Sequence, residues 1–213
     1  AAVPETSIIA YDVNKKTLAQ ARAEGIADII TETIDITFQK CDIIFLCAPV
    51  EYNDDNLITL KQFLSSYCTL TDVGSVKDNI HQHINSLGLS AQFIGGHPMA
   101  GSERFGYGNS KARLLENAYY ILTPSESIKA AKVEQLESLI GNIGAIPLVL
   151  DAKAHDYVTA AVSHLPHIVA ASLVHLVKDS DTEDGIMKMI AAGGFKDITR
   201  IASSSPEMWQ QIC

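Results

Sequence analysis

Asp42-Ile43-Ile44-Phe45-Leu46-Cys47-Ala48-Pro49 is the stretch of this sequence that decides the fold. Between its first and last residues every side chain is apolar. A half-exposed strand alternates apolar and polar residues, whereas an unbroken apolar run is typical of a strand covered on both faces of a parallel sheet. Pro49 ends the run, because proline has no backbone N–H to donate to a neighbouring strand. The stretch therefore predicts a buried parallel sheet.

Similar strand patterns lie on both sides of this stretch, at residues 7–12, 69–74, 92–95, 118–123 and 146–150. Helical patterns separate them, including residues 15–24, which Gly25 ends, and residues 127–140, which carry apolar residues at helical spacing. Strands that alternate with helices are typical of βαβ units. The sequence predicts an α/β fold with a Rossmann-like, doubly wound sheet.

The pattern changes after Asp151. Residues 152–178 carry no strand signal and predict one long, mostly apolar helix interrupted by Pro166. Residues 184–212 predict further helices, broken at Gly193-Gly194 and again near Pro206. We therefore expect two domains, a Rossmann-like sheet domain over residues 1–151 and an all-helical domain over residues 152–213.

Composition excludes several classes of protein. Sixteen basic and 25 acidic residues give a net charge of −9, which argues against a nucleic-acid partner and means that an anionic substrate needs a local cation. We find no signal peptide and no run of about 18 apolar residues, and expect a soluble protein without a membrane partner. The cysteines (Cys41, Cys47, Cys68 and Cys213) lack C-x-x-C spacing and predict reduced, mostly buried thiols in a cytoplasmic protein.

Gly95-Gly96-His97-Pro98-Met99-Ala100-Gly101-Ser102-Glu103 is the stretch richest in chemistry. Its glycines and proline predict a fixed turn directly after a strand. Such a turn would hold His97 at the carboxyl end of that strand, where open α/β sheets bind their ligands. A neutral imidazole at this place can accept a proton from a substrate hydroxyl. The alternative is a loop histidine bonded to a backbone carbonyl.

Other candidate residues have both a chemical and a structural interpretation. Ser75 and Asp78 have the spacing of a capping box, which is compatible with a hydroxyl that also faces a ligand. Arg200 can bind a carboxylate through two parallel hydrogen bonds, or form a salt bridge within the domain. Asp197 can orient Arg200, or place a charge at a helix start. His97, His164 and His167 find no carboxylate that completes a ligand set, so we expect no metal.

Asp12 lies at the tip of the first predicted strand. In a dinucleotide-binding fold such an acid accepts hydrogen bonds from the ribose hydroxyls, and a glycine-rich fingerprint precedes it by about 20 residues. Only eleven residues precede Asp12, and G-x-G-x-x-G occurs nowhere in the chain. We therefore expect the first strand and its glycine turn to lie outside this chain. The sequence also stops inside an apparent helix at Cys213, and we expect the carboxyl end to be incomplete.

Four segments in this order resemble the prephenate dehydrogenase family, whose close relatives are the arogenate dehydrogenases. They are residues 72–77 (DVGSVK), 95–103 (GGHPMAGSE), 163–167 (SHLPH) and 193–202 (GGFKDITRIA). The resemblance covers almost the whole chain. It implies a homodimer with a Rossmann domain and a helical dimerisation domain. It also implies the oxidative decarboxylation of prephenate to 4-hydroxyphenylpyruvate, carbon dioxide and reduced cofactor in tyrosine biosynthesis.

The resemblance assigns roles to individual residues. His97 matches the histidine that accepts the substrate's hydroxyl proton, and Ser75 matches a serine near the nicotinamide and the substrate. Arg200 matches the arginine that binds a substrate carboxylate, and His167 matches a histidine of the substrate pocket.

Ser102 and Glu103 stand where the family often has a threonine and a glutamate at the entrance of the site. Serine keeps the hydroxyl, and Glu103 either gates the site or is a solvated loop acid.

The expected cofactor is NAD rather than NADP. An acid at the position of Asp12 repels a 2′-phosphate and suits a free 2′-hydroxyl. The alternative is that Asp12 only caps the following helix. Ala48 and Pro49, at the end of the fold-deciding stretch, are expected to line the adenosine side of the cofactor.

Two other functions remain as alternatives, and a third, a β-hydroxyacid dehydrogenase, is set aside. Arogenate can replace prephenate as the substrate. A non-catalytic nucleotide-binding or dimerisation module would explain the missing fingerprint, but it leaves His97 and Arg200 without a task. A β-hydroxyacid dehydrogenase would need a lysine on the long helix, where this chain has serine, histidine and proline.

Overall fold

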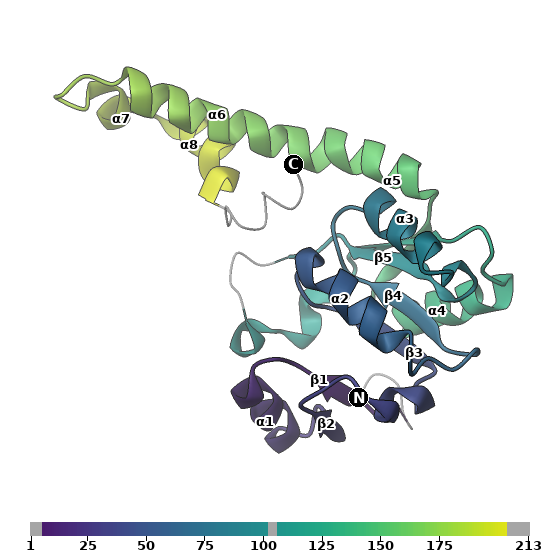
Figure 1. Cartoon of the computed structure of the whole chain (residues 1–213). Coiled ribbons are helices and arrows are strands. Elements are labelled where there is room, and N and C mark those ends of the chain that lie inside the picture. The colour runs from purple at the N-terminus through teal and green to yellow at the C-terminus, as the bar shows by residue number, and fades with distance from the viewer. Residues whose placement is uncertain (1–5, 102–105, 204–213) are drawn as a thin grey trace. The chain divides into compact units, whose positions relative to one another are not determined.

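The computed structural model describes residues 6–101 and 106–203. The chain divides into two compact units, the sheet unit (Ala1–Lys153) and the helical unit (Ala154–Cys213). The strands and helices of the sheet unit are, in chain order, β1 (Ile9–Tyr11), α1 (Lys15–Ala23), β2 (Ile29–Thr31), β3 (Ile43–Leu46), α2 (Val50–Leu60), β4 (Thr69–Asp72), α3 (Asp78–Ser86), β5 (Ile94–Pro98), β6 (Tyr119–Pro124), α4 (Ala130–Asn142) and β7 (Ile146–Val149) (Figure 1).

Most strands of the sheet unit pair in parallel. β1 pairs with β2, β3 with β4, and β6 with β7, all in parallel, and a parallel bridge from Leu70 to Phe93 connects β4 with the start of β5. β5 and β6 are antiparallel. The segment between them contains only short 3₁₀ turns among its described residues, and an antiparallel pair needs no crossover helix. The strands therefore form three small sheets, β1–β2, β3–β4 and β5–β6–β7, and the last of these is mixed rather than wholly parallel.

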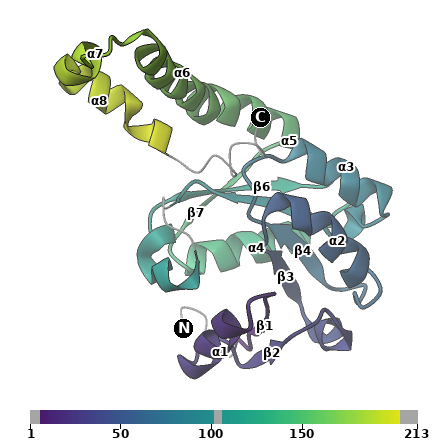
Figure 2. The same ribbon diagram turned by 60° about the vertical axis from the view of Figure 1, so that its left-hand side comes forward.

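Helices cover both faces of the strands from β3 to β6, as the doubly wound prediction requires. On one face Ile44, Leu46 and Leu70 pack with residues of α2 and α3. On the other face Ile94 and Leu122 pack with residues of α4. Side chains alternate along a strand, so Phe93 and Ile94 belong to different cores. Figures 1 and 2 show α2 and α3 on one side of the strands and α4 on the other.

The fold-deciding stretch forms β3, but the prediction that both its faces are covered is wrong at one position. Ile44 and Leu46 are buried, whereas Phe45 is 39% exposed and borders a cleft. β3 and β1 each have a strand partner on one side only among the described residues, and residues of both strands line this cleft. Cys47, which was expected to be buried, is exposed at the end of β3.

The helical unit is dominated by one long helix. α5 (Ala152–Thr159), a π-helical turn (Ala160–His164) and α6 (Leu165–Ser180) follow one another without a break. Pro166 therefore does not interrupt the helix, because the wider π turn accommodates the missing backbone donor. α7 (Ile186–Ile190) and α8 (Gly193–Thr199) follow, and α8 lies beside α6 (Figures 1 and 2). Gly193-Gly194 begins α8 and does not break a helix.

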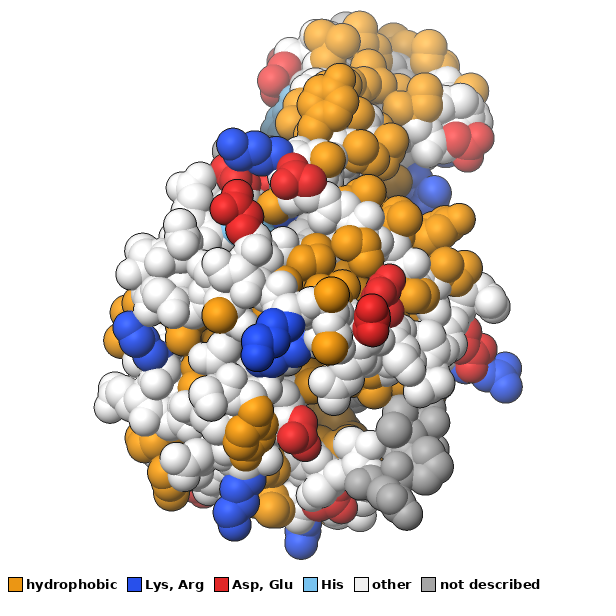
Figure 3. All heavy atoms as spheres, turned by 90° about the vertical axis from the view of Figure 1, so that its right-hand side faces the viewer, with side chains coloured by type: hydrophobic (Ala, Val, Ile, Leu, Met, Phe, Trp, Pro, Cys, Tyr) orange, Lys and Arg blue, Asp and Glu red, His pale blue; other side chains and the backbone are white. Residues whose placement is uncertain are grey.

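The helical unit exposes many apolar side chains (Figure 3). On α6 they include Leu165, Ile168 and Leu176, and on α7 they include Met189 and Ile190. The continuous helix Ala152–Ser180 is also long and apolar enough to cross a membrane, with 11% of its most apolar window buried. The expectation that the chain has no segment long and apolar enough to span a membrane is therefore wrong. The core helix of a soluble protein meets the same two criteria of length and composition.

Candidate active site

His97 lies inside β5, not in a turn that follows it. It is half-buried and stands opposite Ile121 of β6. Because β5 runs in the same direction as β4, the carboxyl ends of these two strands lie at one edge of the sheet. The prediction that His97 lies at the carboxyl end of a strand is therefore confirmed. The residue belongs to the strand itself and not to a turn.

Gly95 and Gly96, the two residues before His97, are required because there is no room for a side chain at either position. Neither glycine has a positive φ, so neither serves the turn that the sequence predicted. A Cβ on Gly95 would lie 2.3 Å from Thr123 Oγ1, and a Cβ on Gly96 would lie 2.4 Å from the backbone oxygen of Asp72. Only glycine allows β5 to approach the end of β4 this closely.

A buried ion pair fills the space beside Gly96. Lys77 Nζ donates to Asp72 Oδ2 and, over 2.8 Å, to the backbone oxygen of Gly96. The same carboxylate accepts from the Gly96 N–H over 3.0 Å and from the Gly74 N–H over 2.9 Å. Lys77 is fully buried and Asp72 is 1% exposed. The pair was not predicted from the sequence, because a lysine normally indicates a surface position, although both residues belong to the DVGSVK segment.

Ser75 is half-buried in the bend between β4 and α3. The capping-box interpretation of Ser75 is wrong, because the N-cap of α3 is Lys77 and the helix begins without a side-chain cap. The serine hydroxyl therefore has no capping task, and it lies one residue beyond Gly74, which Asp72 holds.

Three of the four predicted cofactor residues, Asp12, Ala48 and Pro49, line one cleft of about 540 Å³, whereas Ser75 does not line it. Asp12 and Tyr11 come from the end of β1, and Ala48 and Pro49 follow β3. Asp12 Oδ1 accepts from the Asn14 N–H over 2.7 Å, while the N-cap of α1 is Asn14. The alternative that Asp12 caps this helix is therefore wrong.

His81 is a second, unpredicted histidine near the glycine pair. Its Nε2 lies 2.9 Å from Thr123 Oγ1, and its Nδ1 lies 3.2 Å from Ser125 Oγ. Burial, and then repulsion from Lys77, lowers the pKa of His81. A neutral imidazole between two hydroxyls helps to fix β6 beside α3, which indicates a structural role.

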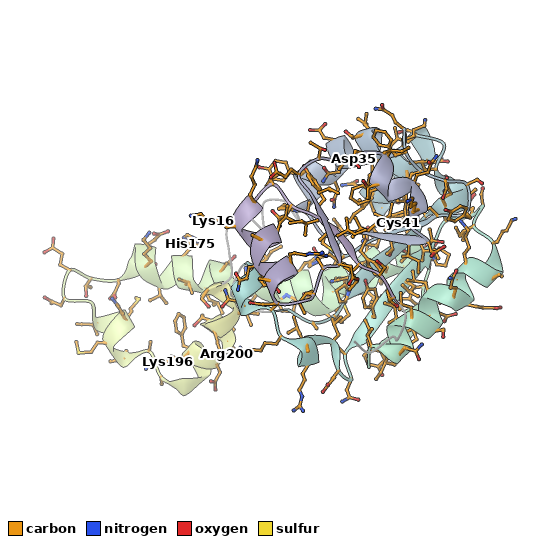
Figure 4. All side chains as sticks on the ribbon, turned by 90° about the horizontal axis from the view of Figure 1, so that it is seen from below. Lys16, Asp35, Cys41, His175, Lys196 and Arg200 are labelled. Atoms are coloured by element: carbon orange, nitrogen blue, oxygen red, sulfur yellow. The ribbon has the colours of Figure 1, made fainter. Side chains whose placement is uncertain are left out.

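The remaining described candidates belong to the helical unit. His167 is buried on α6, and burial lowers its pKa. Arg200 follows α8 directly (Figure 4). Both Arg200 and Asp197 are exposed. Within residues 6–101 and 106–203 Arg200 forms no salt bridge, either with Asp197 or with another acid.

An apolar groove of about 480 Å³ runs beside these residues. Asp197 and Ile198 of α8 line it together with Leu165, Pro166 and Val169 of α6. Ala161 of the π turn also lines the groove, and such turns often occur at functional sites. Burial also lowers the pKa of His164, the last residue of the π turn.

Two predicted residues, Ser102 and Glu103, lie outside the described residues. In the part of the chain that the structure describes, no three His, Cys, Asp or Glu side chains gather as metal ligands.

Comparison with known families decides the assignment. Residues 1–148 match the model of the "Prephenate dehydrogenase, nucleotide-binding domain", and residues 151–213 match that of the "Prephenate dehydrogenase, dimerization domain". The chain belongs to the prephenate dehydrogenase family. The resemblance of the four sequence segments and the predicted α/β fold with a helical domain are thereby confirmed.

Individual members of the prephenate dehydrogenase family are similar over nearly the whole chain. The prephenate dehydrogenase of Bacillus subtilis is 39% identical over 98% of this chain, which spans 57% of that protein. A crystal structure of the A. aeolicus prephenate dehydrogenase with hydroxyphenyl propionate and NAD+ has a TM-score of 0.90 at 33% identity, covering 99% of this chain and 74% of that one. The Synechocystis arogenate dehydrogenase has a TM-score of 0.86 at 29% identity, covering 97% of this chain and 74% of that one.

Proposed function

We propose that this protein is an NAD-dependent prephenate dehydrogenase that makes 4-hydroxyphenylpyruvate in the cytoplasm for tyrosine biosynthesis. The observation that carries the proposal is the match of both family domains, together with His97 on a rigid strand end. The hydroxyphenyl propionate and NAD+ in the A. aeolicus relative support the substrate class and the cofactor.

His97 is the proposed general base. When the carbon that bears the substrate's hydroxyl loses a hydride, positive charge develops on that carbon. Transfer of the hydroxyl proton to a neutral imidazole relieves this charge. The bond to the ring carboxylate then breaks, carbon dioxide leaves, and the electron pair completes the aromatic ring. The ring oxygen regains its proton from the imidazolium of His97, which gives the phenol product. Ser75, at the carboxyl end of the neighbouring strand, is the proposed partner that orients the reacting hydroxyl.

The sheet unit fits a dinucleotide at the cleft. NAD supplies the hydride acceptor when it is bound. Asp12 places a carboxylate at the tip of β1, where it would accept from ribose hydroxyls and repel a 2′-phosphate. Ala48 and Pro49 provide the opposite wall. This arrangement supports NAD over NADP.

The substrate is a dianion in a protein of net charge −9, so it needs a local cation. Arg200 is the proposed carboxylate ligand because it is exposed and forms no salt bridge within the described ranges. His167, Asp197, Ser102 and Glu103 are proposed to complete the substrate pocket, as the family resemblance implies.

We also propose a homodimer. The name of the second family domain and the exposed apolar side chains of α6 and α7 support it. A second copy would cover these side chains, which explains a long apolar helix without a membrane.

Arogenate is the second candidate substrate, because a Synechocystis arogenate dehydrogenase has nearly the same fold. The test is NADH or NADPH formation by the complete protein, with prephenate and arogenate offered separately with each cofactor. We expect the highest turnover with prephenate and NAD. Turnover with arogenate alone would identify arogenate as the substrate. No turnover in any combination would favour the non-catalytic module.

A further inference from the structure

The buried Lys77–Asp72 pair holds the backbone on both sides of the proposed catalytic site. It binds both polar backbone groups of Gly96, the residue before His97. It also binds the N–H of Gly74, the residue before Ser75. The backbone segments that carry Ser75 and His97 therefore share one carboxylate, that of Asp72, which the Lys77 ammonium in turn binds.

Stability alone does not account for this pair. Removing two charges from water is costly, and apolar side chains of similar volume are often at least as stabilising as a buried ion pair. Both side chains are also fully enclosed, so they are not available to bind substrate or cofactor directly. What the pair provides is a fixed geometry for the backbone groups that it binds.

The sheet needs such a device at this place. β4 ends at Asp72, and the bridge between Leu70 and Phe93 is the last backbone pairing between β4 and β5 within the described ranges. Beyond this bridge, the side chains of Asp72 and Lys77 make the hydrogen bonds to Gly96 that a neighbouring strand would otherwise make. The lengths of two side chains therefore set the separation of the two strand ends.

We propose that Lys77 and Asp72 are positioning residues that fix Ser75 and His97 relative to each other for the reaction. The inference rests on the proposed dehydrogenase function, since it assigns these residues to the same site. A displacement of about 1 Å at a reacting group costs roughly 100-fold in rate. Loss of the pair should therefore lower kcat and leave KM almost unchanged, because neither residue touches substrate.

The experiment compares three variants of the complete protein. Lys77→Met removes the ammonium, and the double variant Asp72→Asn/Lys77→Met avoids a lone buried carboxylate. Lys132→Met is the matched control, because Lys132 Nζ also donates to a backbone oxygen, that of Cys68, at the opposite end of β4 (3.0 Å). For each variant, kcat and KM for prephenate, the dissociation constant of NAD and the thermal midpoint are measured.

We expect Lys77→Met to lose about 100-fold in kcat with KM and NAD binding unchanged. The double variant should regain thermal stability but not kcat, and the control should keep wild-type kcat. Recovery of kcat in the double variant would show that the pair acts only through stability and would overturn the proposal. An equal effect of Lys132→Met would also overturn it.

A readout without catalysis separates this inference from the proposed function. Amide hydrogen exchange of residues 93–97 should be faster in the double variant and unchanged in the control. If the wild-type protein oxidises neither prephenate nor arogenate, the proposed function fails, and faster exchange still shows that the pair holds β5. Unchanged exchange in the double variant contradicts the positioning role whatever the substrate is.

Discussion

Gly96→Ala tests the close approach of β5 to β4. The added Cβ would lie 2.4 Å from the backbone oxygen of Asp72, 2.9 Å from Thr71 Oγ1 and 3.0 Å from Tyr120 Cε1. The nearest atom belongs to a buried strand backbone and cannot rotate away as a flexible side chain would, so β5 itself has to move. Such overpacking costs about 1–3 kcal/mol, and this site belongs near the upper end of that range.

Alanine also reduces the conformational freedom of the unfolded chain, which offsets about 0.4–1 kcal/mol of the cost. We therefore expect the free energy of unfolding to fall by about 2 kcal/mol. For a protein of this size the thermal midpoint should fall by about 4–8 °C.

Thermal and urea unfolding followed by circular dichroism measure this effect. Gly141→Ala is the control, because Gly141 lies in α4 with open space around its Cα. Alanine there should raise stability by about 0.5–1 kcal/mol. Wild-type stability for Gly96→Ala, or an equal loss in both variants, would refute the steric argument.

Three further predictions concern single side chains. His97→Asn should abolish NADH formation while prephenate still binds; near-normal turnover would exclude the general base. Arg200→Met should weaken substrate binding by about 10- to 150-fold, the value of a charged hydrogen bond, and an unchanged KM would contradict this role. Because burial lowers the pKa of His81, the unfolded state binds more protons, so stability should fall as the pH drops below about 6.5. His81→Gln should reduce this slope in urea titrations, and an unchanged slope would assign it to other groups.

Apolar runs in the sequence predicted most strands, because burial on both faces leaves a continuous signal. β4, with all four residues buried, is the clearest case. β2 has only three residues, of which two are exposed, and its pattern was too weak to detect. The antiparallel step from β5 to β6 was also missed, because strand direction depends on the connection and not on the local pattern.

The candidate site was predictable where chemistry follows from residue type. His97 and Asp12 were found because an imidazole or a carboxylate at a strand tip indicates a ligand. Lys77 was not found, since its burial depends on Asp72 and on a strand 19 residues later in the chain. The glycine pair at residues 95–96 was recognised for the wrong reason, because close packing across strands cannot be distinguished from a turn in one sequence.

The enclosure of Lys77 has a consequence for chemical labelling of the protein. Its amine is fully buried and donates to Asp72 and to Gly96, whereas Lys16 of α1 is exposed. An amine-reactive reagent should therefore modify Lys16 in the folded protein and reach Lys77 only when the sheet unit opens. The labelling rate of one lysine is thus a measure of how often the ends of β4 and β5 separate.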